Sequence, residues 1–275
     1  MSKTIRHHKL PNGIEIAYDS KANLDMLCRE IFDGKIYAAN GISVAEGDCI
    51  VDIGANIGFF ILLLNQQLKS ATVYGFEPIP ATFELLKINT AKHNHLDLKL
   101  FQCGLSKAVG KATFHHFPLT SIASTMYPQS SSEYQRDSRR FVLNDLQRRS
   151  VLLRNVISIT PEWLWYPITE IARRYFQRSV RVECELDTLT NVIARESINR
   201  IDLLKIDTEG AEHDILASIN DADWKIIRQI IVEVHDGRIG LDSVLSLLQS
   251  KNFRTTHVKA DPTIDGLFMV YGIRI

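Results

Sequence analysis

Val51-Asp-Ile-Gly-Ala-Asn-Ile-Gly-Phe59 is the stretch that decides the fold, because an apolar strand ends in it and a helix begins. Two glycines, Gly54 and Gly58, let the backbone turn sharply and approach a ligand closely. The start of the helix then presents free N–H groups to a carboxylate or a phosphate. Asn56 occupies the second glycine position of the G-x-G-x-x-G pattern, which counts against a pyrophosphate-binding dinucleotide site.

The same strand–turn–helix pattern recurs along the chain. Apolar strands are expected at 49–53, 72–76, 98–103, 203–206, 230–234, 254–258 and 268–273. Helices are expected at 57–67, 80–93, 212–219 and 241–250. This alternation predicts an α/β fold, with a mostly parallel sheet covered by helices on both faces. Because no repeat of 20–50 residues is found, solenoids and propellers are excluded.

The length of 275 residues, with 45% apolar and 23% charged residues, suits one large α/β domain or a domain with an inserted cap. Residues 1–40 are expected to form a hairpin and a helix, and residues 41–275 the main domain. Residues 120–180 interrupt the alternation and are far longer than a usual crossover. They are interpreted either as a cap or lid over the ligand edge or as a structural or oligomerising elaboration.

The charge distribution limits the class of partner. The chain has no net charge, but residues 136–181 hold ten arginines and four acids, an excess of 10 − 4 = +6. The overall balance argues against a general nucleic-acid binder, whereas this segment could meet an anionic partner. Residues 1–13 lack the apolar core of a secretory signal, and no apolar run is long enough to span a bilayer. The four scattered cysteines have no C-x-x-C pair, which favours reduced thiols in a cytoplasmic protein.

Two further strand ends are expected beside the glycine loop. Glu77 ends the second strand, where an acid can accept hydrogen bonds from both hydroxyls of a ribose. Its alternative role is to cap the helix that follows Pro78. The third strand ends at Gly104 and Leu105 in a small-residue turn, which could flank an adenine ring or be a plain surface turn.

Charged side chains cluster where the fourth and fifth strands end. Lys205, Asp207 and Glu209 follow one strand, and Glu233 and His235 lie on the same side of the next. Charges at a strand exit are costly if they are buried without partners, which favours a site, although the acids could instead stabilise the next helix. A histidine can take the proton from an attacking hydroxyl, which makes His235 a candidate general base.

Four motifs together carry a family resemblance, namely Asp-Ile-Gly-Ala-Asn-Ile-Gly at 52–58, Phe-Glu-Pro at 76–78, Lys-Ile-Asp-Thr-Glu-Gly-Ala-Glu at 205–212 and Val-Glu-Val-His at 232–235. With them the chain resembles the FkbM-type family of S-adenosylmethionine (SAM)-dependent methyltransferases. The match spans roughly residues 10–110 and 180–275 and leaves residues 120–180 unexplained. It implies a Rossmann-like class I methyltransferase fold of seven strands, the last antiparallel. It also implies O-methylation of a hydroxyl on a small-molecule or carrier-bound natural product, such as a polyketide or a sugar.

The resemblance also assigns roles to residues. The glycine loop would hold the methionine part of SAM and Glu77 the ribose. The expected cofactor-binding residues are Asp52, Gly54, Ala55, Asn56, Gly58, Phe59, Glu77, Pro78, Gly104 and Leu105. The expected acceptor-side and catalytic residues are His235, Asp207, Glu209, Lys205 and Glu233. No metal is expected, although carboxylates and a histidine would suit magnesium or manganese as a variant.

Two other classes of function compete with this interpretation. A nicotinamide-dependent oxidoreductase is disfavoured by Asn56, and a catalytically silent, methyltransferase-like binding module stays open. DNA and RNA are not expected as substrates, because the chain lacks both an Asn/Asp-Pro-Pro-aromatic loop and a Pro-Cys nucleophile. The acceptor could be anionic, and the chain could form homo-oligomers.

Overall fold

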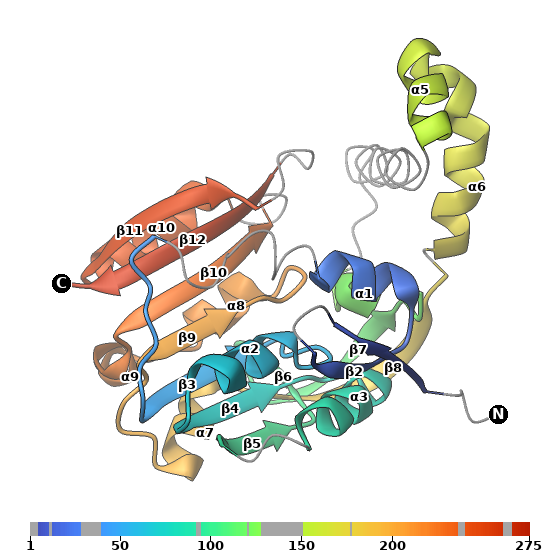
Figure 1. The fold of residues 1–275 in the computed structure, drawn as a ribbon. Coiled ribbons are helices and arrows are strands. Elements are labelled where there is room, and N and C mark those ends of the chain that lie inside the picture. Colours follow the sequence, from blue (N-terminus) through green and yellow to red (C-terminus); the bar gives the residue numbers. More distant parts are fainter. Residues whose placement is uncertain are drawn as a thin grey trace.

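The computed structural model describes residues 5–10, 13–28, 40–91, 95–119, 121–127, 151–176, 178–235, 240–260 and 266–275. A large twisted sheet forms its centre, with helices on both faces (Figure 1). Residues 128–150 of the expected cap, including the arginines between 136 and 149, and residues 11–12 of the expected hairpin lie outside the described residues.

The central sheet has seven strands in the order β11-β12-β10-β9-β3-β4-β5. Neighbours from β5 to β10 run parallel, whereas β12 is antiparallel to both β10 and β11. The fold class expected from the sequence is therefore confirmed. The strands are β3 (Asp48–Ile53), β4 (Ala71–Phe76), β5 (Asp97–Phe101), β9 (Leu203–Ile206), β10 (Gln229–His235), β11 (Phe253–Lys259) and β12 (Leu267–Arg274).

Apolar side chains alternate between the two faces of this sheet. In β3, Val51 and Ile53 pack into the cluster that includes α7 to α10, whereas Ile50 packs into the cluster that includes α2 and α3. Each face thus forms its own core, as a parallel sheet requires. The helices are α2 (Phe59–Gln67), α3 (Pro80–Thr90), α7 (Leu189–Glu196), α8 (Glu212–Ala217), α9 (Asp221–Ile226) and α10 (Leu241–Ser250).

Some boundaries and elements differ from the expectation. α2 begins at Phe59 instead of residue 57, because Gly58 has a left-handed φ of 92° and caps the helix. α7 and α9 were not expected, since they are short and lie between stronger signals. Each helix begins at a side-chain N-cap. Thr188 caps α7 by accepting the N–H of Asn191, and Asn220 caps α9.

The N-terminal section packs onto the main domain. It comprises β1 (Arg6–Lys9), β2 (Glu15–Tyr18) and α1 (Lys21–Cys28), and the two strands pair antiparallel. Ile16 and Leu24 share a buried cluster with Phe59 of α2 and Leu85 of α3. The side chain of Asn89 also bonds the backbone N–H and carbonyl of Ala17. Residues 13–28 therefore share a core with the helices that follow.

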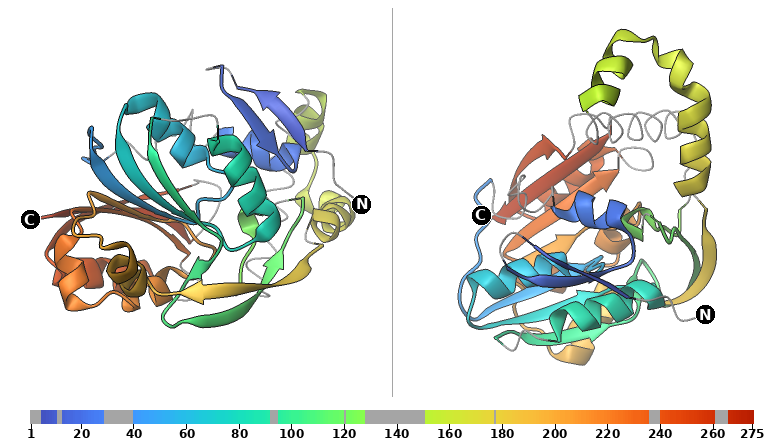
Figure 2. Two further views of the ribbon diagram at one scale, coloured as in Figure 1. Left: turned by 90° about the horizontal axis from the view of Figure 1, so that it is seen from below. Right: turned by 45° about the vertical axis from the view of Figure 1, so that its right-hand side comes forward.

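A second, three-stranded sheet was not expected from the sequence. It has the order β6-β8-β7, with β6 (Gly104–Leu105), β7 (Gly110–His116) and β8 (Val180–Asp187). β7 and β8 pair antiparallel, so the long segment between them leaves and rejoins the domain at neighbouring strands. That segment contains η3 (Ser121–Ala123), α5 (Val151–Ile159), η4 (Glu162–Trp165) and α6 (Tyr166–Phe176). α5 and α6 stand away from both sheets (Figures 1 and 2).

Two observations bear on the class of protein. Within the described ranges, none of the helices has the length and apolar content needed to cross a bilayer. All four cysteines are free thiols. Burial raises the pKa of Cys49, Cys103 and Cys184 to about 11, so these thiols are neutral and poor nucleophiles.

Candidate active site

The loop after β3 is held against the ends of both neighbouring strands. The N–H groups of Gly54 and Ala55 donate to the carbonyl of Phe76 in β4, at 3.0 and 2.9 Å. On the opposite side, a Cβ atom added to Gly54 would lie 1.8 Å from the carbonyl oxygen of Asp207, which follows β9. Gly54 also has a φ of 84°, which L side chains rarely adopt. The loop therefore fits only with glycine at this position, and it joins the carboxyl ends of three strands.

The remainder of the loop leads into α2. Asn56 is left-handed, with a φ of 49°, and its side-chain oxygen accepts the N–H of Ile57 at 2.8 Å. Asparagine tolerates this conformation better than most residues do, which explains how it replaces a glycine. Phe59 was expected to bind cofactor, but its side chain is buried in the cluster shared with the N-terminal hairpin. Only its backbone can face a ligand of this loop.

Glu77 is buried beside this loop, at the end of β4. One of its carboxylate oxygens accepts the N–H of Ile79 at 2.9 Å, and the backbone N–H of Asn56 is a second donor. Burial raises the pKa of Glu77 to about 7, and the two donors oppose that rise only in part. The charge of Glu77 near neutral pH therefore depends on the polar groups that contact its carboxylate.

The expected turn at Gly104 and Leu105 is in fact β6, which pairs in parallel with β8. A Cβ atom at Gly104 would meet Leu186 at 2.9 Å and Pro78 at 3.5 Å, so Gly104 packs next to Pro78. Leu105 is 2% exposed and belongs to the main core. Leu105 is thus a core residue, and the expectation of a turn at this position was wrong, whereas the cofactor-binding role of Gly104 and Leu105 stays a prediction.

Three charged residues form a row across the ends of β3 and β9, and two of them, Lys205 and Asp52, are buried. The ammonium of Lys205 lies 3.1 Å from Asp52 and 2.9 Å from Asp207, and both Lys205 and Asp52 are nearly inaccessible to solvent. Burial lowers the pKa of Lys205, but Asp207 and Asp52 outweigh that effect and hold it above its ordinary value. Lys205 is therefore charged, and it cannot serve as a proton acceptor in this arrangement.

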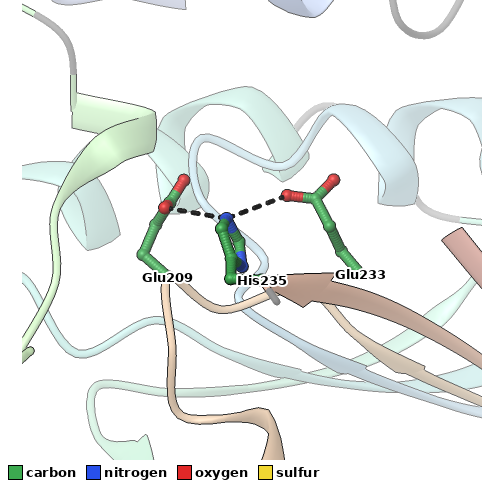
Figure 3. Close-up of side chains that lie close together, drawn as sticks. All are labelled: Glu209, Glu233 and His235. Carbon is green, nitrogen blue, oxygen red and sulfur yellow. Dashed lines mark ion pairs between the residues drawn. The ribbon is translucent and has the colours of Figure 1, made fainter. Parts of the chain in front are cut away.

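His235, at the end of β10, is surrounded by carboxylates from three segments, and Figure 3 shows two of them, Glu209 and Glu233. Its Nε2 atom lies 3.1 Å from Glu209 and 3.7 Å from Glu233, and its Nδ1 atom lies 3.2 Å from Glu212. Burial lowers the pKa of His235, but the neighbouring carboxylates, Glu209 first, raise it well above its ordinary value. A general base must be unprotonated, so the role expected for His235 requires that a ligand displace its proton from this cluster.

Sequence reasoning missed three side chains at this edge. Glu212 was part of a motif but was not predicted to be a site residue, although its carboxylate lies 3.2 Å from Nδ1 of His235. Thr125 donates its hydroxyl to the carbonyl of Glu209, and the hydroxyl of Tyr127 bonds Asp214. No local signal marks Thr125 or Tyr127, because each meets its partner from more than 80 residues away.

The structure thus brings the expected residues together as two neighbouring groups. One holds the glycine loop with Glu77, and the other holds the charged ends of β9 and β10. Asp207 belongs to both, because its carbonyl touches Gly54 and its carboxylate binds Lys205. Open α/β sheets bind their ligands at this carboxyl edge.

Three features are typical of a class I SAM-dependent methyltransferase. They are a seven-stranded sheet whose last strand, β12, is antiparallel, a glycine loop after β3, and an acid at the end of β4. Residues 52–255 match the methyltransferase FkbM domain. The chain belongs to the FkbM methyltransferase family.

Known proteins are similar to nearly the whole chain. It is 30% identical to 31-O-demethyl-FK506 methyltransferase FkbM from Streptomyces tacrolimicus, over 97% of this chain and 95% of that protein. It is 28% identical to methyltransferase sdnD from Sordaria araneosa, over 91% and 90% of the two chains. Among solved structures, methyltransferase FkbM from Methylobacillus flagellatus KT aligns with a TM-score of 0.47 and 11% identity, over 85% of this chain and 45% of that one.

Proposed function

We propose that the chain transfers the methyl group of SAM to a hydroxyl oxygen of a small-molecule or carrier-bound natural product. The observation that carries this proposal is the meeting of the glycine loop with the carboxylate-rich ends of β9 and β10 at Asp207. Membership of the methyltransferase family indicates SAM as the methyl donor. The relative with 30% identity is named as a methyltransferase of 31-O-demethyl-FK506, which indicates an oxygen as the acceptor atom in that protein.

The residues around the glycine loop suit SAM. The Oδ2 atom of Asp52 is buried and, among the described residues, has no hydrogen-bond partner. A buried, unsatisfied carboxylate oxygen is costly, and the ammonium of a methionine moiety is a donor that would satisfy it. Glu77 is placed one strand away, where its carboxylate would accept the ribose hydroxyls.

SAM supplies a sulfonium-bound methyl group, and the chain has to align an acceptor with it. The acceptor oxygen forms the new O–C bond, the C–S bond breaks with its electron pair left on sulfur, and the hydroxyl proton leaves. Positioning supplies most of the rate in such an in-line displacement. The Glu209–Glu233–His235 cluster is the group we assign to the acceptor hydroxyl and the removal of its proton.

The segment 120–180 is proposed to cover the acceptor side of the site. Thr125 and Tyr127, near its start, bond residues that follow β9. Three of its described arginines, Arg154, Arg174 and Arg178, are exposed. They would attract an anionic acceptor, such as one carried on a phosphopantetheinyl arm.

The test is methyl transfer from labelled SAM to a panel of hydroxylated acceptors, read as a mass increase of one methyl group. We expect His235→Ala to lower turnover and leave the affinity for SAM nearly unchanged. If NADH but not SAM raised the melting temperature, the oxidoreductase interpretation would replace this one. If SAM bound and no acceptor were methylated, a silent binding module would be favoured.

A further inference from the structure

Three potential metal-ligand atoms converge at the end of β10. They are one carboxylate oxygen each from Glu209 and Glu233 and a ring nitrogen of His235, and all lie within 4.8 Å of one another. The Nε2 atom of His235 is 3.1 Å from Glu209 and 3.7 Å from Glu233. Figure 3 shows the two carboxylates on opposite sides of the imidazole, facing the same nitrogen.

Glu212 fixes which ring nitrogen faces the cluster. Its Oε1 atom lies 3.2 Å from Nδ1 of His235 and also accepts the backbone N–H of Gly210 at 2.9 Å. Glu212 is itself buried, at 6% exposure, so its carboxylate is held in place. A carboxylate acceptor at Nδ1 keeps a proton on Nδ1, so a cation that displaces the proton of Nε2 would meet the lone pair of Nε2 on the side of Glu209 and Glu233.

Once that proton is displaced, three electron-pair donors face one another in a partly buried site. Glu209 and Glu233 are 33% and 19% exposed, and His235 is 16% exposed. Both carboxylates face the same ring nitrogen, and a divalent cation at that place would neutralise both of them. The carboxylate–histidine pair formed by Glu212 and His235 is also the usual outer support of a histidine metal ligand.

We propose that Glu209, Glu233 and His235 bind one divalent cation, with Glu212 orienting His235 as the supporting residue. Two carboxylates and one imidazole suit manganese, magnesium or a similar cation. Neighbouring ligands around a six-coordinate ion with bonds of ~2.1 Å are ~3 Å apart and opposite ligands ~4.2 Å apart. The distances from Nε2 of His235 to Glu209 and Glu233, 3.1 and 3.7 Å, fall in this range. The 4.8 Å that bounds the whole set exceeds it, so the carboxylates would have to close in on the ion.

The cation would act in the reaction assigned above, and this part rests on the proposed function. Three protein ligands leave positions open for the oxygen of the acceptor. A bound cation lowers the pKa of that hydroxyl, so the proton leaves to solvent and the oxygen attacks as an alkoxide. His235 then acts as a ligand instead of the lone base that the sequence suggested.

The experiment titrates the metal-stripped full-length protein with Mn²⁺ alone, followed by electron paramagnetic resonance and calorimetry, and repeats the titration with SAM present. We expect one tight Mn²⁺ site per chain. Glu233→Gln and His235→Ala should each weaken it by at least ~10-fold, because a ligand is lost. Glu212→Gln should weaken it by ~10-fold or more, as loss of an outer-shell partner does.

His213→Ala is the matched control, since His213 lies on α8 next to Glu212 but is 46% exposed and points to Asp214. It should leave Mn²⁺ affinity unchanged. SAM affinity, measured on every variant, reports whether the protein is folded. Two results would overturn the cation site and leave the methyltransferase proposal standing. In the first, the wild-type protein binds SAM but takes up no Mn²⁺. In the second, Mn²⁺ binding survives both Glu233→Gln and His235→Ala. Failure to bind SAM would instead count against the proposed function.

Discussion

Replacing Gly54 with alanine is the sharpest test of how the glycine loop meets β9. The added Cβ atom would lie 1.8 Å from the carbonyl oxygen of Asp207, whereas such contacts essentially never fall below 3.0 Å. One of the two strand ends must therefore move by at least 3.0 − 1.8 = 1.2 Å. The left-handed φ of 84° adds about 1–2 kcal/mol for any L side chain.

Together these effects should lower the free energy of unfolding by about 4 kcal/mol, at the upper end of single substitutions. The residual folded protein should also lose methyl transfer, because a 1 Å misplacement of a binding group costs about 10²-fold in rate. Gly110→Ala is the control: Gly110 lies in β7 and has no heavy atom within 4 Å of an added Cβ. Its free energy of unfolding should change by no more than about 0.5 kcal/mol.

Urea denaturation followed by circular dichroism gives the free energies, and calorimetry gives the affinity for SAM. Both variants are measured beside the wild type at one pH and one salt concentration. If Gly54→Ala unfolded at the same urea concentration as Gly110→Ala and bound SAM equally well, the close contact between the loop and Asp207 would be refuted.

Two further predictions concern the same edge of the sheet, and a third concerns the segment 120–180. Because the pKa of Glu77 is about 7 in the folded chain and 4.5 in the unfolded one, the folded state holds an extra proton between these values. The free energy of unfolding should therefore fall by ~3 kcal/mol as pH rises from 4.5 to 7. SAM affinity should rise over the same window. In pH titrations of stability and of binding, Glu77→Gln should remove both effects. Lys205→Met leaves two carboxylates without their ammonium and should cost ~3–5 kcal/mol by urea denaturation, whereas the exposed Lys111→Met should have no measurable effect. Turnover of an anionic acceptor should fall as salt rises, and Arg154→Gln combined with Arg178→Gln should flatten that dependence; salt-independent kinetics in the wild type would contradict the role given to these arginines.

The sequence by itself determined the sheet. Runs such as Cys49–Ile53 and Leu203–Ile206 are apolar except for Asp52 and Lys205, which pair with each other, because strands of a parallel sheet are buried on both faces. Parallel topology also places every strand's carboxyl end at one edge, so residues that follow β3, β4, β9 and β10 had to be neighbours. Periodicity is a local property, and it was enough for these conclusions.

Only the tertiary structure decided how those neighbours pair. Lys205 meets Asp52 across 153 positions of sequence, and Thr125 meets Glu209 across 84. β6 is only two residues long, and β8 alternates apolar and polar residues instead of forming a continuous apolar run like the strands of the central sheet. Their sheet was therefore missed. Contacts of this kind depend on how whole elements dock, since a shift of one residue in register or a small rotation of α8 would give His235 a different carboxylate. The sequence identified the charged residues of the site, but the packing of the elements determined which of them form pairs.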